Sequence, residues 1–459
     1  MSHYHFIGIG GTGLSPIARI LLERGHQVSG SDVLLSPLAQ DLQAMGARLY
    51  TGHASSQIDG ADVVIRSSAI PDSNPEVIAA EQANIPVLKR VDFLRELTAG
   101  QKVMAIAGTH GKTTTTAMLA WCLDQMGLDP SYVVGGTVKN LGKNAHAGKG
   151  DYFVIEADEY DSMFLGLIPD FLVVTNIEHD HPDFYPTPAV YYAAFQKLVN
   201  LIPQNGKLFA CLDHPATAEL NRGAPAHIQR LPYGTSTDAL YQVSNIHHPI
   251  ECGVAFDLNL PSRDFSEGGN LEIKLEIPGS HNALNAAAAL AVIHSAGLEM
   301  QQAVTALRTF SGSGRRFDIQ AEIGGITLID DYAHHPTEIR STLAAARCRY
   351  PDRRIWAVWQ PHTYSRTREL MTDFIQAFDD CDHVVVTEIY ASREPIQDFS
   401  SAEVVRRMQH PDARYISSLN ETSDYLTRNL KPGDVLLVLS AGDADLINRQ
   451  VIAYLKGGA

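Results

Sequence analysis

Residues 108–113, Gly-Thr-His-Gly-Lys-Thr, have the types and spacing of a phosphate-binding loop. They follow a predicted buried strand, Lys102–Ala107, and open a predicted helix over residues 112–126. In such a loop the backbone N–H groups surround phosphates, the lysine reaches the β and γ oxygens, and the threonine hydroxyl binds Mg²⁺. Ile106 stands where the usual motif has its first glycine, so the prediction depends on the flanking strand and helix. The residues predicted to bind the nucleotide here are Gly108, Thr109, His110, Gly111, Lys112, Thr113 and Thr114.

Carboxylates and histidines follow the next two predicted strands. The run Glu-Ala-Asp-Glu-Tyr-Asp at 156–161 comes directly after strand Phe153–Ile155, and a His/Asp cluster at 179–183 follows strand Phe171–Thr175. The carboxyl ends of parallel strands form the binding edge of an α/β sheet, so both groups are expected beside the phosphates. An exposed acidic loop is the alternative for the first run, and a zinc site is the alternative for the second. No cysteine joins the histidines, and the phosphate loop favours Mg²⁺.

An earlier glycine turn predicts a second phosphate site. Residues 8–13 fit G-x-G-x-x-G between a predicted strand, His3–Ile9, and a predicted helix, Leu14–Arg24. Asp32 lies near the end of the next strand, where a ribose-binding acid is expected. The glycines allow a backbone to approach a pyrophosphate, and the helix N-terminus supplies N–H groups and partial positive charge. Any diphosphate satisfies these requirements, so both a dinucleotide and a UDP-sugar remain open, as does a tight turn without a ligand.

These turns belong to three successive α/β units. The strand–turn–helix pattern restarts near residues 98–100 and again near Phe310, where residues 311–314 form a Gly/Ser hinge. We therefore predict three domains, 1–98, 99–311 and 312–459. Strands alternate with helices in each of them, which is typical of mostly parallel sheets.

Composition limits the classes of partner. The 459 residues are 45% hydrophobic and 19% charged, which is typical of a globular protein. The net charge of −16 repels nucleic acid and acidic membranes, so an anionic ligand must be held by local groups. We find no run long enough for a membrane helix and no signal peptide, and we expect a cytoplasmic protein. Scattered cysteines, predicted to be buried free thiols, are Cys122, Cys211, Cys252, Cys348 and Cys381.

Together the motifs resemble the ATP-dependent Mur ligases of peptidoglycan synthesis, over nearly the whole chain. Besides the two glycine turns and the acidic run, the resemblance is carried by Ser67-Ser68-Ala69-Ile70, Thr175-Asn176-Ile177-Glu178, Gly279-Ser280-His281-Asn282 with Asn285, Arg315-Arg316-Phe317, residues 330–338 and residues 360–367. The family's fold implies a Rossmann-like UDP-sugar-binding domain, a central P-loop ATPase-type domain with a mostly parallel sheet, and a C-terminal Rossmann-like α/β domain that binds the amino acid.

The resemblance also implies roles for individual residues. Those expected to hold Mg²⁺ are Thr113, Glu156 and His181. ATP would be bound by the phosphate loop together with Asn282, Asn285 and Arg316. The expected UDP-sugar contacts are Gly10, Gly11, Thr12, Gly13, Asp32, Ser67 and Ser68. His334 and Arg366 are expected to bind the amino acid, and the expected catalytic residues are Lys112, His281, Asp331 and His334.

The implied activity is ATP-dependent joining of L-alanine to UDP-N-acetylmuramate through an acyl phosphate, in cell-wall biogenesis. Tyr160 departs from the alanine-adding members, which usually have serine there, and resembles the murein-recycling ligase that adds L-Ala-γ-D-Glu-meso-diaminopimelate. Residues 360–367 resemble the alanine-adding members instead. A second alternative, an NAD(P)-dependent oxidoreductase, rests on the first glycine turn alone. The expected partners are small molecules, with neither nucleic acid nor membrane, and the chain is expected to be a monomer or homodimer.

Overall fold

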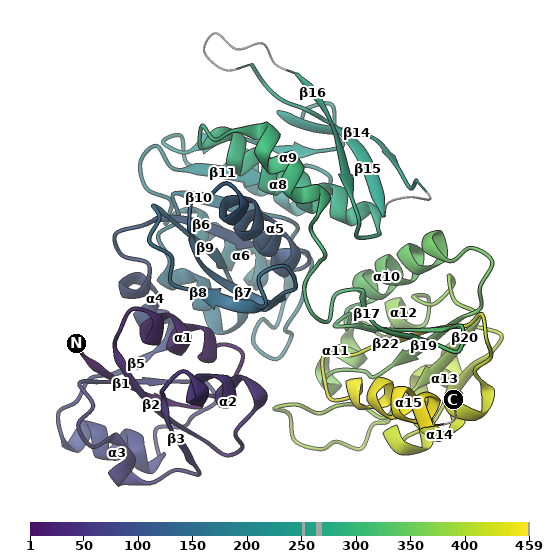
Figure 1. The fold of residues 1–459 in the computed structure, drawn as a ribbon, viewed down its shortest axis with the longest axis horizontal. Coiled ribbons are helices and arrows are strands. Elements are labelled where there is room, and N and C mark those ends of the chain that lie inside the picture. The colour runs from purple at the N-terminus through teal and green to yellow at the C-terminus, as the bar shows by residue number, and fades with distance from the viewer. Residues whose placement is uncertain (250–252, 263–268, 458–459) are drawn as a thin grey trace. The chain divides into compact units, whose positions relative to one another are not determined.

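The computed structural model describes residues 1–249, 253–262 and 269–457. The chain forms two compact units, each made of several segments. The first unit comprises residues 1–178, 189–242 and 285–307, and the second comprises 179–188, 243–284 and 308–459. Figure 1 traces the chain through them.

A five-stranded parallel sheet of order β3-β2-β1-β4-β5 begins the first unit. Its strands are β1 (His3–Ile7), β2 (Gln27–Asp32), β3 (Arg48–Thr51), β4 (Val63–Arg66) and β5 (Val87–Lys89). The helices between them are α1 (Ser15–Glu23), α2 (Pro37–Ala44), η1 (Ser55–Ile58) and α3 (Pro75–Gln82), and α4 (Arg90–Leu97) follows β5. The chain leaves β1 for β2 on one side and reaches β4 on the other, so the carboxyl ends of β1 and β4 border a topological switch point.

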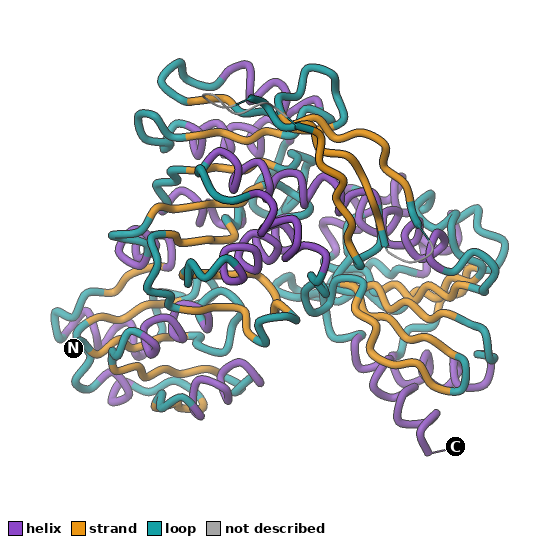
Figure 2. Tube along the Cα trace, turned by 45° about the horizontal axis from the view of Figure 1, so that its top comes forward, coloured by secondary structure: helices purple, strands orange, loops and turns teal. Residues whose placement is uncertain are grey.

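The second sheet of this unit has seven strands in the order β12-β11-β10-β6-β9-β7-β8. Its strands are β6 (Lys102–Ala107), β7 (Ser131–Val138), β8 (Lys143–His146), β9 (Tyr152–Glu156), β10 (Phe171–Val174), β11 (Lys207–Ala210) and β12 (Gln229–Arg230). The associated helices are α5 (Lys112–Gln125), η2 (Tyr160–Gly166), α6 (Pro188–Val199), α7 (Pro215–Gly223), α8 (Ser280–Ser295) and α9 (Met300–Arg308). Only β7 and β8 pair antiparallel among its described ladders, and strands lie between helices in Figure 2. The central strand β6 is buried from Val103 to Ala107.

Two further sheets complete the fold. One has four strands, β13 (Tyr233–Gly234), β14 (Tyr241–His247), β15 (Val254–Asn259) and β16 (Asn270–Leu275). The other lies in the second unit, has the order β17-β18-β22-β19-β20-β21, and is parallel except for β17. Its elements are β17 (Asp318–Ile323), β18 (Ile326–Asp331), α10 (Pro336–Arg349), β19 (Ile355–Trp359), α11 (Tyr364–Glu369), α12 (Met371–Phe374), β20 (His383–Val386), α13 (Ala402–Arg407), β21 (Ala413–Tyr415), α14 (Leu419–Asn429), β22 (Val435–Leu439) and α15 (Asp445–Gly457).

The core of the six-stranded sheet follows the two-residue period of a strand. In β22, Val435, Leu437 and Leu439 pack into one apolar cluster with α10, while Leu436 and Val438 pack into another with α14 and α15. Both faces are therefore covered, which explains why this strand is a continuous apolar run. Because both faces are covered, polar loops lie at the carboxyl edge of the sheet.

The structure confirms the predicted α/β class and most predicted elements, with ends that differ by one or two residues. The domain boundaries at 98/99 and 311/312 stay predictions. One cysteine prediction is wrong: Cys348 is exposed, because it lies on the outer side of α10. Cys122, Cys211 and Cys381 are buried free thiols, whereas Cys252 lies outside the described residues. Among the described residues, none of the helices combines the length and the apolarity that a membrane span requires.

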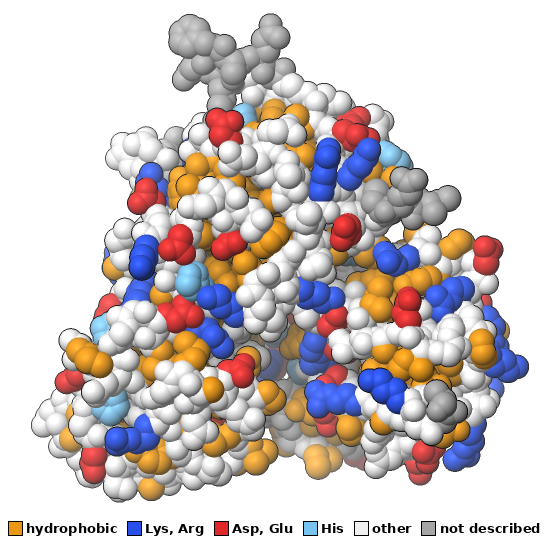
Figure 3. Space-filling view, viewed as in Figure 1, with side chains coloured by type: hydrophobic (Ala, Val, Ile, Leu, Met, Phe, Trp, Pro, Cys, Tyr) orange, Lys and Arg blue, Asp and Glu red, His pale blue; other side chains and the backbone are white. Residues whose placement is uncertain are grey.

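Acidic and basic side chains are interspersed over the face drawn in Figure 3, without a broad patch of either sign. With a net charge of −16, the average field of this chain disfavours a phosphate ligand. Any phosphate site must therefore supply its positive charge from a few local groups.

Candidate functional site

The first glycine loop, residues 8–13, lies at the carboxyl end of β1, which pairs with β4. Gly8 has a φ of +88°, and a Cβ built on it would lie 3.0 Å from the Cβ of Ser67, so glycine is required there. The N–H of Gly10 donates to Oδ2 of Asp32 at 2.8 Å, so this carboxylate fixes the loop. The structure brings the predicted UDP-sugar residues to one sheet edge: Gly10, Gly11, Thr12, Gly13, Asp32, Ser67 and Ser68.

The phosphate loop connects β6 to α5. Gly108 has a φ of +130°, and a Cβ on it would lie 2.0 Å from Oγ1 of Thr175. Gly111 has a φ of +82°, and a Cβ on it would lie 2.5 Å from Oδ1 of Asn285. The buried Asn285 also accepts a hydrogen bond from the hydroxyl of Thr115 at 3.2 Å. The two glycines are therefore required by close contacts as well as by backbone conformation, and Asn285 lies against the loop.

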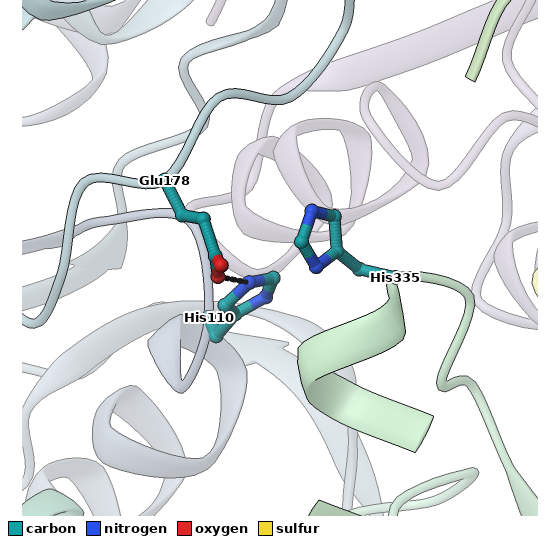
Figure 4. Close-up of side chains that lie close together, drawn as sticks. All are labelled: His110, Glu178 and His335. Carbon is teal, nitrogen blue, oxygen red and sulfur yellow. Dashed lines mark hydrogen bonds and ion pairs between the residues drawn. The ribbon is translucent and has the colours of Figure 1, made fainter. Parts of the chain in front are cut away.

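The end of β10 braces this loop. The N–H of His110 donates to Oδ1 of Asn176 at 2.9 Å, and the hydroxyl of Thr175 donates to the carbonyl of His110 at 2.5 Å. The His110 ring and the Glu178 carboxylate point toward each other, with Nε2 and Oε2 2.8 Å apart (Figure 4). The segment after β10 thus fixes the conformation of the loop.

Lys112 forms a buried ion pair. Its Nζ lies 2.9 Å from Oε2 of Glu159 and donates to the carbonyls of Gly108 and Thr109 at 2.5 and 3.1 Å. The lysine side chain is 13% exposed and the glutamate 1%. Burial disfavours the ammonium charge, but the carboxylates of Glu159, Glu156 and Asp158 together outweigh burial and raise the pKa of Lys112. Lys112 is therefore protonated at neutral pH. The Tyr191 hydroxyl also donates to Glu159, at 3.2 Å.

Two of the predicted metal ligands lie together. The Thr113 hydroxyl donates to Oε1 of Glu156 at 3.0 Å, and the N–H of Gly135 holds the other carboxylate oxygen at 2.6 Å. A hydroxyl beside a carboxylate is a donor set that suits Mg²⁺. His181, the third predicted ligand, has a left-handed backbone with a φ of 54° and belongs to the second unit.

Arg366 is held by a buried carboxylate in the second unit. Its Nη2 and Nε lie 2.7 and 2.8 Å from Oδ1 of Asp180, and the two side chains are 3% and 6% exposed. Burial alone would raise the pKa of Asp180, yet the Arg366 charge holds it well below its ordinary value. Arg366 also donates to Nδ1 of His362 at 2.9 Å. Burial lowers the pKa of His362 to about 2, so that imidazole is neutral.

Asp331, at the end of β18, organises the turn that follows. Its carboxylate accepts from the N–H groups of Phe317 and Ala333, both at 2.8 Å, and from the Thr342 hydroxyl at 3.2 Å. Burial raises the pKa of Asp331. With both oxygens engaged, Asp331 is better suited to positioning the turn than to taking a proton.

His334 is a neutral, oriented imidazole. Burial lowers its pKa to about 3. Its Nδ1 lies 2.8 Å from the Tyr332 carbonyl, which can only accept, so Nδ1 carries the proton and Nε2 offers the lone pair. Nδ1 also lies 3.4 Å from the carboxylate of Glu338, which in turn lies 3.4 Å from Nη1 of Arg316. His334 and Arg316 are thus linked through Glu338.

The remaining predicted ATP and catalytic residues begin α8. Gly279 has a φ of +102°, and a Cβ on it would lie 2.5 Å from Cε1 of His281. His281 is exposed, whereas the buried Asn282 donates its amide to the Pro278 carbonyl at 2.7 Å. The glycine therefore provides the space in which the His281 ring lies.

Sequence reasoning missed Glu159, Glu338 and His362 as members of the site. Glu159 was visible within the acidic run but had no signal that separated it from Asp158. Glu338 and His362 lie inside two of the motifs quoted above, and only the fold shows which side chains they contact.

The chain matches known family models along most of its length. The family models "Mur ligase family, catalytic domain", "Mur ligase middle domain" and "Mur ligase, glutamate ligase domain" match residues 3–102, 106–293 and 315–442. The chain belongs to the Mur ligase family. Its three-domain α/β fold is that of the family, as predicted, and it is an enzyme of the ATP-dependent ligase class.

Individual Mur ligases match over full length. A UDP-N-acetylmuramate–L-alanine ligase of Desulfosudis oleivorans is 43% identical over 456 residues, covering 98% of each chain. The crystal structure of a UDP-N-acetylmuramate-alanine ligase from Thermotoga maritima matches with a TM-score of 0.84 and 27% identity, covering 100% of both chains. A murein peptide ligase from Psychrobacter arcticus matches with a TM-score of 0.74 and 26% identity, covering 99% of both.

Proposed function

We propose that this Mur ligase joins L-alanine to UDP-N-acetylmuramate at the expense of ATP in peptidoglycan synthesis. The chain is similar over its full length to UDP-N-acetylmuramate–L-alanine ligases, and this similarity is the main support for the proposal. The chain also has two separate glycine loops, a phosphate loop and a G-x-G-x-x-G loop, as a reaction of ATP with a nucleotide sugar requires. The oxidoreductase alternative leaves the phosphate loop and its buried Lys112 without a role. The proposal retains the residue roles predicted from the sequence, except that Asp331 positions the turn after β18 instead of acting in catalysis.

The reaction needs activation, because an amide does not form spontaneously from a carboxylate in water. A lactyl carboxylate oxygen attacks the γ-phosphorus of ATP, the bond from phosphorus to the β–γ bridging oxygen breaks, and ADP leaves. The alanine nitrogen then attacks the acyl carbon, the carbon–oxygen bond to phosphate breaks, and the nitrogen loses a proton. No side chain forms a covalent bond in this scheme, so the protein acts through positioning and charge.

The site residues suit these tasks. Protonated Lys112 meets the transferring phosphoryl group, and Arg366 meets a carboxylate or phosphate with a planar pair of donors. The neutral His334 offers Nε2 as an acceptor that orients the amine. Its low pKa makes it a weak base, so its contribution is orientation rather than proton removal.

Mg²⁺ would be held by Thr113, Glu156 and His181. The hydroxyl and carboxylate already lie 3.0 Å apart, which fits a cation that prefers oxygen ligands. When bound, the ion neutralises charge on the phosphate oxygens.

The second candidate is the murein-recycling ligase, with L-Ala-γ-D-Glu-meso-diaminopimelate as the amine substrate. Tyr160 in the acidic run favours it, and the fold also matches a murein peptide ligase. Higher similarity of the whole chain to alanine ligases favours L-alanine.

One experiment tests both candidates. Phosphate release from ATP is measured with UDP-N-acetylmuramate and L-alanine, glycine, L-serine or the tripeptide. We expect release with L-alanine at a kcat/KM at least tenfold above that with the tripeptide. Preference for the tripeptide would establish the second candidate, and no release with any amine would remove both.

We infer a cytoplasmic location because ATP and nucleotide sugars are cytoplasmic substrates. The chain is proposed to act as a monomer or homodimer on small molecules, without nucleic acid or membrane. Sedimentation of the purified chain tests the oligomeric state.

A further inference from the structure

Arg90, the first residue of α4, lies over the first glycine loop. A Cβ built on Gly13 would lie 2.9 Å from Nη1 of Arg90, 3.7 Å from its Cζ and 3.8 Å from its Cδ. Gly13 is the third glycine of the G-x-G-x-x-G motif, a position usually explained by close helix–strand packing. In this chain the missing side chain makes room for a guanidinium group.

Arg90 also contacts the acidic run, through the same Nη1 atom. Its Nη1 lies 3.6 Å from Oδ2 of Asp158, within ion-pair range, and the arginine side chain is only 11% exposed. Its Nε is buried and has no hydrogen-bond acceptor among the residues that the structure describes. A buried N–H donor without an acceptor is unusual, because leaving it unbonded destabilises the folded chain.

Arg66, the last residue of β4, is used differently. Its Nη2 lies 2.5 Å from Oδ1 of Asp72, and its Nη1 donates to the carbonyl of Ile70 at 3.1 Å. Arg66 therefore holds the turn that follows β4. Arg90, in contrast, lies against the glycine loop, and its Nε–H donor has no acceptor among the described residues.

We propose that Arg90 binds the diphosphate of the nucleotide sugar. A guanidinium presents several N–H donors in one plane and forms paired hydrogen bonds with phosphate oxygens. The glycine loop supplies backbone N–H groups and partial charge only, so Arg90 adds the full positive charge that a diphosphate needs in this acidic protein. Asp158 orients the guanidinium through Nη1. This inference rests on the proposed function, because it assumes a UDP-sugar in that site.

The test is calorimetric binding of UDP-N-acetylmuramate, UDP, UMP and uridine to the full-length wild type and to Arg90→Gln. We expect the variant to bind UDP-N-acetylmuramate and UDP about 10–100-fold more weakly, because charged hydrogen bonds are lost. The loss should be smaller for UMP and absent for uridine. In turnover, the KM for the nucleotide sugar should rise while the KM for ATP stays within twofold.

Arg95→Gln is the matched control, since Arg95 is exposed on the same helix and the charge change is identical. It should bind all four ligands like the wild type. Arg90→Lys keeps the charge but loses the planar fork, and we expect an intermediate loss for UDP. This second variant keeps the test decisive should Arg90→Gln fail to fold.

Unchanged UDP binding in Arg90→Gln and Arg90→Lys would overturn the inference, as would an equal loss for UDP and uridine, which indicates a structural role. Failure of the wild type to bind UDP-N-acetylmuramate would instead overturn the proposed function. The two failures are therefore distinguishable in one set of titrations.

Discussion

Lys112 and Glu159 show how a single residue pair can prepare a phosphate site. The ammonium is bonded to two carbonyls of its own loop and to one buried carboxylate, so it is charged and ordered before any nucleotide arrives. Such a pair depends on both members, because removing one leaves an uncompensated buried charge.

We predict that Glu159→Gln lowers the free energy of unfolding by about 2–4 kcal/mol, because it leaves the Lys112 charge without its partner. Glutamine preserves the shape of the side chain and an oxygen acceptor for the Tyr191 hydroxyl. Urea denaturation at pH 7.5 measures the change. Glu81→Gln, at an exposed position on α3, is the control and should stay within about 0.5 kcal/mol of the wild type. Equal stabilities of Glu159→Gln and the control would contradict the ion-pair argument.

The neutral state of His334 leads to a prediction about pH. Burial lowers its pKa to about 3, whereas an unfolded histidine titrates near 6.5. Between these values the unfolded chain binds more protons, so this histidine makes the protein less stable as the pH falls below about 6.5. Between pH 7.5 and 5.0 the wild type should lose about 1–2 kcal/mol more than His334→Gln does.

Urea denaturation of both proteins at the two pH values measures the difference. The wild-type value at pH 7.5 serves as the reference, since His334 is neutral in both states there. A His334→Gln variant that loses as much stability as the wild type on acidification would show that His334 is not held neutral.

The sequence predicts the strands, loops and helices that carry the site better than it predicts the side-chain contacts between them. Strand β6 and the loop after it are predictable because a buried apolar run, two glycines and a helix follow one another locally. The Asp180–Arg366 pair is not predictable in this way, because 186 positions separate its members. The left-handed backbone at His181, likewise, has no local signal.

The two glycine-dependent turns at the ends of α5 provide a comparison within one element. Gly108, before the helix, has a φ of +130° and its Cβ would lie 2.0 Å from Thr175 Oγ1. Gly127, after the helix, has a φ of +73°, and no atom of the described residues lies within 4 Å of its Cβ position. We predict that Gly108→Ala reduces kcat/KM for ATP more than 100-fold, because the loop must move away from β10.

Gly127→Ala should cost about 1–2 kcal/mol of stability from the left-handed backbone alone and leave kcat/KM for ATP within threefold. Steady-state kinetics and urea denaturation of both variants make the comparison. A similar loss of ATP turnover in the two variants would mean that backbone strain, rather than the contact with Thr175, is decisive.

At the scale of the whole molecule, the first unit holds two sheets whose phosphate loops serve different ligands in the proposed function. Glu23, at the end of α1, reaches from the first sheet to β8 at the edge of the second. Its Oε2 lies 2.7 Å from Nδ1 of His146 and accepts the N–H of Ala147 at 2.7 Å, while Lys143 lies 3.7 Å from Oε1. This cluster ties the two sheets together.

This cluster should make the contact between the two sheets depend on pH. The hydrogen bond with Glu23 raises the pKa of His146. Protonated His146 therefore stabilises the folded chain fully below its unfolded pKa near 6.5, and this stabilisation is lost as the pH rises through its folded pKa. Burial acts to raise the pKa of Glu23, but its bonds with His146 and Ala147 lower it, so the carboxylate is charged throughout that range.

Glu23→Gln should therefore destabilise the protein more at pH 6 than at pH 9, as measured by urea denaturation. His146→Gln is the matched variant, and it should remove the difference between the two pH values. A cost of Glu23→Gln that is the same at both pH values would show that the backbone bond to Ala147, rather than charge, joins the sheets.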